Sequence, residues 1–234
     1  DLSFDLSEMN VHYGVITDTD SFEPLRRPVI LAPFLAYNRK LDPALTQKLT
    51  DYVRRGGTLI IAHTFGQNDR YLHPSPESET LLRDMRGCTI APGKRGPITL
   101  HGKNFPDTEL PDAHYVETDP NQLGPDTEVL LTMTTEHGEQ PALLRRAYGR
   151  GTLYYLLFNP LRSTYCGEPD AISRTSLPVI RHLCRCLNMP ADDQLGNRGY
   201  ALANGRVNIH ENMLHAPRHL PSVKAGLYAD EYGE

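Results

Sequence analysis

Between residues 28 and 66, two short apolar runs flank a single amphipathic helix pattern, and this order limits the folds open to the chain. The runs are Val29–Leu35 and Leu59–Ala62. The pattern between them begins at Asp42-Pro43, which suits a helix N-terminus, and ends at Gly56-Gly57, which suits a left-handed stop. Neither run alternates with polar residues, so both are expected to be covered on two faces, as the strands of a parallel sheet are. The segment therefore predicts a strand–helix–strand unit.

Further helix and strand patterns surround this unit and predict a mixed α/β body. Ser75-Pro76 suits a helix start and Gly87 a helix end. Residues 171–187 predict a longer helix, in which Pro178 indicates a late start or a kink. Strand patterns recur at residues 9–17, 128–133, 142–148 and 152–158.

Turn residues divide the remaining segments. Gly149-Arg150-Gly151 predicts a hairpin turn between two of the strand patterns. Residues 88–126 are rich in Gly, Pro and Asp, and they predict an irregular excursion with two short strand candidates at residues 98–101 and 113–117. The tail from Arg198 onward predicts short strands, with Asn204-Gly205 as a hairpin turn. We therefore predict two parts, a body over residues 1–190 and a linker with a β-rich tail over residues 191–234.

Composition excludes several classes of protein. The 234 residues suffice to bury a core, and the net charge of -5 argues against nucleic acid as a partner. No apolar run approaches the roughly 20 residues that span a bilayer, so no membrane partner is expected. No signal peptide pattern is visible, which leaves a cytoplasmic or a secreted location open. Four cysteines are too few for a disulfide scaffold, and Cys184 and Cys186, two apart on a predicted helix, cannot face one metal ion.

Five segments, taken in order, carry a family resemblance. They read VILAPFL, LDPALTQKLTDYVRRGGTLIIAHTFG, QNDR, LRDM and LRRAYGRGTLYYL. In this order and spacing they resemble the middle domain of family 42 β-galactosidases, usually called the trimerisation domain, over roughly residues 8–190. The resemblance implies a class I glutamine-amidotransferase-like fold. We therefore expect an α/β, flavodoxin-like three-layer sandwich with a mostly parallel sheet, plus a small β appendage formed by the tail.

Two departures from that family affect what the chain is expected to be. The Gly-Tyr-Pro-Gly that usually precedes the LRDM-type helix is replaced by Leu72-His73-Pro74-Ser75-Pro76. The chain also begins where the family domain would have completed its first strand and helix. We therefore expect a piece of a longer polypeptide, or a subunit that needs a partner.

The sequence lacks the nucleophile that an active amidotransferase needs. Such an enzyme places a cysteine on a sharp strand-to-helix turn beside a His base. The matching position here holds His63-Thr64-Phe65-Gly66, and no G-x-C-x-G or G-x-S-x-G occurs in the chain. Glycoside hydrolysis needs two carboxylates across a sugar, and in family 42 these lie in an upstream (β/α)8 barrel that this chain cannot contain. We therefore expect no catalytic residue here.

Candidate substrate-binding residues lie at the carboxyl ends of the predicted strands, where ligands of parallel sheets bind. They are His63, Thr64, Asp69, Arg70 and Asn159. His63 suits a general base or a hydrogen-bonded residue at a loop edge. Asp69 and Arg70 suit a sugar hydroxyl or a local ion pair.

The tail carries three histidines, His210, His215 and His219, within ten residues. His210 and His215 are five apart, so on a helix they would diverge by about 140°, unlike the i, i+4 pair of a zinc protease. Pro217 also disfavours a helix through this segment. We expect no metal and no cofactor, and a tail that packs on a neighbour, although a metal held by a loop stays open.

These observations favour a non-catalytic oligomerisation and active-site-supporting domain or subunit of a β-galactosidase-like glycoside hydrolase. The expected partners are a catalytic (β/α)8 barrel in the same polypeptide or a partner subunit, further copies of the chain, and a carbohydrate substrate. Two alternatives stay open. One is a stand-alone sugar-binding or hydrolytic member of the amidotransferase-like superfamily, and the other is a purely structural sensor or scaffold domain.

Overall fold

The computed structural model describes residues 6, 11, 13–32, 43–68, 71, 73–160, 169–188, 197–202 and 205–210. The chain divides into two compact units. One unit is Ile16–Pro178, and the other combines Asp1–Val15 with Val179–Glu234. No helix of the described residues is long and apolar enough to cross a membrane.

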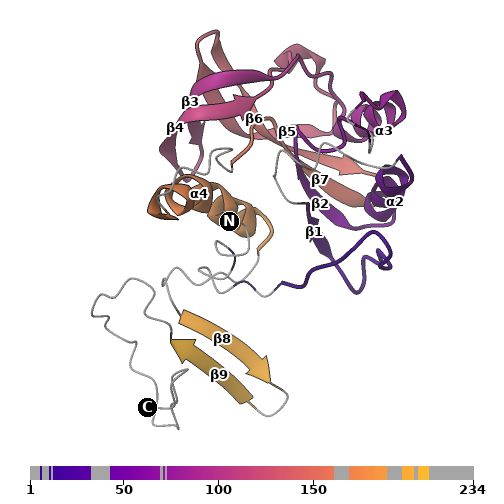
Figure 1. The fold of residues 1–234 in the computed structure, drawn as a ribbon, viewed down its shortest axis with the longest axis vertical. Coiled ribbons are helices and arrows are strands. Elements are labelled where there is room, and N and C mark those ends of the chain that lie inside the picture. Colours follow the sequence, from indigo (N-terminus) through magenta and orange to yellow (C-terminus); the bar gives the residue numbers. More distant parts are fainter. Residues whose placement is uncertain are drawn as a thin grey trace. The chain divides into compact units, whose positions relative to one another are not determined.

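A single mixed sheet forms the centre of the larger unit (Figure 1). Its strand order is β1-β2-β7-β6-β5-β3-β4, in which β1–β2 and β2–β7 are parallel and the other four pairs are antiparallel. The strands are β1 Val29–Leu31, β2 Thr58–Ala62, β3 Lys94–Gly102, β4 Phe105–Tyr115, β5 Thr127–Thr135, β6 Gly138–Tyr148 and β7 Gly151–Leu156.

The prediction of a flavodoxin-like three-layer sandwich with a mostly parallel sheet is wrong. Four of the six strand pairs are antiparallel, and the described residues hold three α-helices. Two-residue turns cause the difference, because such short turns can join only antiparallel strands. They lie at residues 103–104, 136–137 and 149–150. The parallel arrangement is limited to the strand–helix–strand unit, where the crossover contains a helix.

The prediction that residues 88–126 form an irregular excursion is wrong. The segment holds two of the longer strands, β3 and β4. Its prolines explain the error. Pro97 lies at a register shift between Gly96 and Ile98, and Pro106 and Pro111 lie in β4, an edge strand. Edge strands and bulges tolerate proline because no ladder hydrogen bond is lost there.

The helix of the strand–helix–strand unit and the helix that follows it keep their predicted boundaries. Helix α2 spans Pro43–Arg54 and buries Leu49, Tyr52 and Val53, and α3 spans Pro76–Arg86. The Ser75 hydroxyl caps α3 by accepting from the Ser78 N–H at 3.4 Å. Gly87 ends α3 in the left-handed conformation at φ 71°, where glycine is strain-free. The caps of α3 that are legible in the sequence are therefore present in the structure, whereas Asp42, the predicted N-cap of α2, lies outside the described residues.

Residues 16–28 run along α2 and are fastened to it. Lys48 Nζ donates to the carbonyl oxygens of Asp18 and Asp20 at 2.5 Å each. Arg55 reaches Glu23 Oε1 at 3.2 Å, and the rings of Phe22 and Tyr52 meet edge to face at 6.5 Å. Residues 16–28 therefore cover part of the surface of α2.

The second unit contains the end of the long helix α4, Pro169–Cys186, which passes from one unit to the other, and a separate hairpin. Pro178 lies inside α4, so the helix does not start late. Strands β8, Asn197–Leu202, and β9, Gly205–His210, pair antiparallel, which confirms the predicted hairpin at Asn204-Gly205. The strand predicted at residues 9–17 is not formed among its described residues, which are 11 and 13–17. The boundary predicted between residues 190 and 191 stays a prediction.

Candidate functional site

Two neighbouring parallel strands bring three of the five candidate residues to one edge of the sheet. His63 and Thr64 directly follow β2, and Asn159 follows β7 by three residues. The His63 N–H donates to the Leu156 carbonyl at 2.8 Å, and the Asn159 N–H donates to the His114 carbonyl at 2.8 Å. Asp69 and Arg70 lie outside the described residues.

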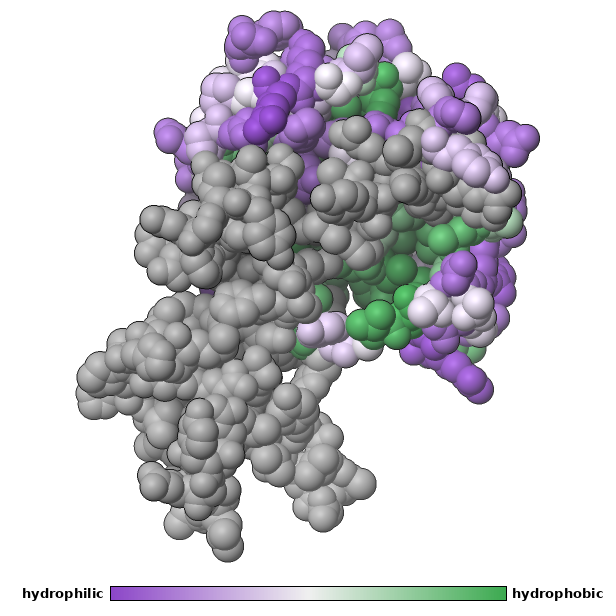
Figure 2. Space-filling view, viewed as in Figure 1, coloured by the Kyte–Doolittle hydropathy of each residue, from purple (hydrophilic) through white to green (hydrophobic). Residues whose placement is uncertain are grey.

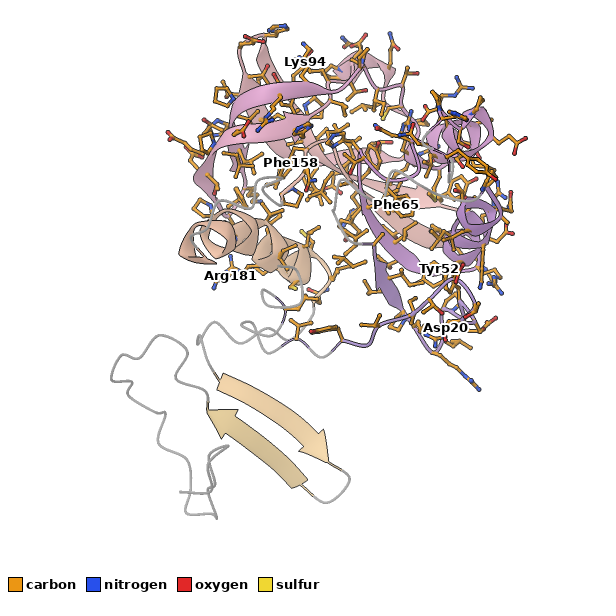
Figure 3. All side chains as sticks on the ribbon, in the orientation of Figure 1. Asp20, Tyr52, Phe65, Lys94, Phe158 and Arg181 are labelled. Carbon is orange, nitrogen blue, oxygen red and sulfur yellow. The ribbon has the colours of Figure 1, made fainter. Side chains whose placement is uncertain are left out.

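These three side chains are packed into the protein. His63, Thr64 and Asn159 are only 3%, 3% and 7% exposed. A tight turn follows β2, with Phe65 N–H donating to the Ala62 carbonyl and Gly66 at φ 71°. Phe65 and Phe158, which lie next to the candidate residues, are also buried (Figure 3). Within the described residues, this edge is therefore a buried, hydrogen-bonded end of the two strands.

The glycines of the YGRG segment serve a close approach of two backbones. A Cβ on Gly151 would lie 2.2 Å from the Val53 carbonyl oxygen and 2.3 Å from that of Gly57. A Cβ on Gly149 would lie 2.8 Å from Arg54 Cα. The turn also donates from Arg150 N–H to the Arg54 carbonyl at 3.0 Å. The β6–β7 turn thus caps the C-terminal end of α2, which leaves carbonyl groups to satisfy.

A polar cluster ties α2, α3 and β6 together beside this turn. Arg54 Nη2 donates to the Tyr148 hydroxyl at 2.6 Å and lies 3.5 Å from Asp84 Oδ2. The Tyr148 hydroxyl donates to Asp84 Oδ2 at 2.5 Å. Arg146 Nη1 donates to the carbonyl oxygens of Asp84 and Met85 at the end of α3. Burial, and then the hydrogen bond to Asp84, raise the pKa of Tyr148, so its phenol stays protonated as a donor.

A buried arginine at the end of α3 connects this helix with β7. Arg86 is 2% exposed, and its guanidinium group donates to both carboxylate oxygens of Glu79 and to the Cys88 carbonyl. Its Cζ lies 5.8 Å from the ring centroid of Tyr155 on β7. A buried charge needs such partners, because an unpaired one would carry a large desolvation cost.

Sequence reasoning missed Arg86, Arg146 and Tyr148 as key residues. One signal was present: Glu79 and Arg86 are seven apart, so they share a face of α3. The partners of Arg146 and Tyr148 lie more than sixty positions away in the sequence, which no local pattern reveals.

Cys88 and Cys184 lack the features of nucleophiles. Cys88 and Cys184 are buried. Burial raises the pKa of Cys88, and it raises the pKa of Cys184 to about 11. The thiolate, which is the reactive form, is therefore rare at neutral pH. Cys166 lies outside the described residues. Within the described part of the chain, no group of three or more His, Cys, Asp or Glu residues could hold a metal ion.

A family profile described as "Beta-galactosidase trimerisation domain" matches residues 5–165. Comparison with curated proteins finds no match. Among solved structures, a catalytic mutant of Gan42B, a GH42 β-galactosidase from G. stearothermophilus, is 19% identical with a TM-score of 0.61, covering 84% of this chain and 27% of that one.

Two further β-galactosidases show the same degree of likeness. That of Bacillus circulans sp. alkalophilus is 15% identical with a TM-score of 0.60, covering 83% of this chain and 28% of its own. That of the haloarchaeon Halorubrum lacusprofundi is 16% identical with a TM-score of 0.61, covering 83% and 27%. The chain thus spans about a quarter of the length of these structures, and at such identities the likeness concerns the fold.

Proposed function

The chain belongs to the β-galactosidase trimerisation domain family, and from this premise we propose that it holds copies of a β-galactosidase-like glycoside hydrolase together without cleaving glycosides itself. The catalytic (β/α)8 barrel would lie in the same polypeptide or in a partner subunit. The substrate of the assembly would be a carbohydrate. We also propose that the chain is related to amidotransferases. The support is that β1, β2 and β7 are parallel and that α2 lies between β1 and β2 in the chain.

One observation carries the proposal of a non-catalytic role. The motif residues that the chain shares with the family contact one another, and their hydrogen-bonding groups are used in packing. Gly149 and Gly151 allow the β6–β7 turn to reach α2, and Arg54, Asp84 and Tyr148 bond to each other. A catalytic motif would instead direct such groups toward a substrate.

We propose that the sheet edge that carries the candidate residues supports a neighbouring active site and is not itself catalytic. His63, Thr64 and Asn159 are buried, which suits a role in holding the strand ends in place. The substrate site would lie next to them and would be completed by another part of the assembly. Asp69 and Arg70 are proposed to belong to the same edge. A His63→Gln variant should therefore lower the affinity of the assembled enzyme for substrate more than its turnover rate.

We expect the full chain to be inactive on an aryl β-galactoside. The measurement is release of the aryl alcohol by the purified chain, compared with buffer. Activity above the buffer rate would contradict the proposal. It would favour the alternative of a stand-alone hydrolase, because it would place a working carboxylate within these 234 residues.

A further inference from the structure

The ends of α2 and α3 meet the β6–β7 turn, and all three carry arginines. The Arg150 N–H donates to the Arg54 carbonyl at 3.0 Å, which joins the turn to α2. Arg146 Nη1 donates to the Asp84 carbonyl, which joins β6 to α3. Arg83 precedes Asp84 on α3. We call the surface formed by Arg54, Arg83, Arg146 and Arg150 the arginine surface.

This arginine surface has an excess of positive charge. Arg54 lies 3.5 Å from one carboxylate oxygen of Asp51 and 3.5 Å from one of Asp84. Arg83 and Arg150 are exposed, and neither forms an ion pair with any described residue. Four arginines therefore face two carboxylates, and two of the guanidinium groups are available to a partner.

An exposed face of the sheet is acidic. One row of paired residues crosses β4, β3, β5 and β6. The row consists of Glu109, Thr99, Thr134 and Glu139. Residues paired across strands share a face, and side chains alternate along each strand. Leu100, the neighbour of Thr99, is fully buried, so the row lies on the face turned away from the core.

The carboxylates of this face are not neutralised by Lys or Arg. Glu109 and Glu139 are exposed, and neither forms an ion pair within the described part of the chain. Asp107 Oδ1 lies 2.9 Å from Nδ1 of His101, whose other ring nitrogen lies 3.0 Å from the Thr134 hydroxyl. We call Asp107, Glu109 and Glu139 the acidic sheet face. The surrounding residues 94–140 contain nine Asp or Glu but three Lys or Arg.

The two surfaces lie far apart on the same unit. Glu139 and Tyr148, at opposite ends of β6, are nine residues apart. At about 3.3 Å per residue this separates them by about 30 Å. Figure 1 shows β3 and β4 on one side of the unit and α2 and α3 on the other. The unit therefore has a positive end and a negative end.

We propose that copies of this chain assemble head to tail, with the arginine surface of one copy against the acidic sheet face of the next. A ring of three copies needs contact between two different surfaces, because a surface that binds itself closes after two copies. Opposite charges on the two surfaces give the contact its direction. The proposal rests on the proposed role in holding copies together, and it adds which surfaces meet. It uses the face of the sheet, so it needs no strand added at the β4 edge.

Charge reversal with rescue tests this pairing. Arg83→Glu with Arg150→Glu makes the arginine surface acidic, and Glu109→Lys with Glu139→Lys makes the sheet face basic. Either pair of changes should raise the dissociation constant of the assembly at least about tenfold in sedimentation equilibrium, because like charges then face each other. All four changes in one chain restore opposite charges and the net charge of the parent, so assembly should return. Added salt should weaken assembly of the parent, because it screens exposed charges.

The matched control is Glu77→Lys, because Glu77 is exposed in the first turn of α3, outside both surfaces. This variant should assemble like the parent, and circular dichroism should show that every variant is folded. Trimers that persist with either pair of changes, or a folded fourfold variant that stays a single copy, would overturn the charge pairing and leave the proposed function standing. A parent chain that stays a single copy at every concentration would refute both.

Discussion

At the scale of single residues, the chain uses glycine where two backbones nearly touch. The two glycines of the β6–β7 turn face α2 at distances that no side chain can enter, whereas Gly96 on β3 has open space around it. The sequence alone showed a turn at this point. It could not show the reason for the second glycine, which lies in the neighbouring helix.

Replacing Gly151 by alanine tests this close approach. Its Cβ would overlap two carbonyl oxygens, and overpacking of this kind costs about 1–3 kcal/mol or more. Denaturant unfolding of Gly151→Ala should therefore show a loss of this size, while Gly96→Ala should change stability by less than about 0.5 kcal/mol. Equal stability of the two variants would mean that the turn does not press on α2.

Tyr52 should make stability depend on alkaline pH. Burial raises its pKa from 10.0 to about 12. The folded chain then keeps the phenol protonated where the unfolded chain has lost the proton, so this stabilisation is complete below pH 10 and lost as pH rises to 12. Unfolding free energies measured from pH 8 to 12 should fall less steeply for Tyr52→Phe, by about 2–3 kcal/mol over the range. Parallel curves would show that Tyr52 is not shielded from water.

At the scale of elements, local signals were sufficient for helices and hairpin turns but not for the sheet. Helices α2 and α3 carry their caps in the sequence, and Gly149-Arg150 marked one hairpin. The β3–β4 hairpin was missed, because Pro97, Pro106 and Pro111 are typical of loops and are tolerated only at an edge or a bulge. Strand order depends on pairing between distant segments, such as β3 with β5, which no local pattern contains.

The candidate site, like the sheet, could be predicted from the sequence only in part. His63, Thr64 and Asn159 follow neighbouring parallel strands, whose ends meet at one edge, but their role in substrate binding stays a prediction. Their burial could not be read from the sequence, since it depends on what packs around the strand ends.

The docking of α2 on the sheet is tested through Leu49. This side chain is 5% exposed on the apolar face of the helix. Removing it should leave a cavity, and Leu49→Ala is therefore expected to lower the free energy of unfolding by about 2–5 kcal/mol. Ala44→Ser, at an exposed position of the same helix, serves as the control and should have little effect. A loss below roughly 0.5 kcal/mol for Leu49→Ala would contradict the packing of α2.

At the scale of the whole molecule, the shared motifs hold elements together rather than form a reaction centre. The chain spans about a quarter of the length of the β-galactosidases that it resembles, and it is similar in fold to that part of them. Edge strand β4 carries Pro106, Pro111 and several acidic residues, which disfavour the addition of another strand there. We therefore expect contacts between copies to use other surfaces, such as the apolar surface visible in Figure 2.

The native mass of the full 234-residue chain tests the central claim most directly. Native mass spectrometry or sedimentation equilibrium across a range of concentrations should show a species of three copies, since the family is one of trimerisation domains. Dissociation on dilution should return single copies that remain folded. A folded single copy at every concentration, with no larger species, would contradict the account.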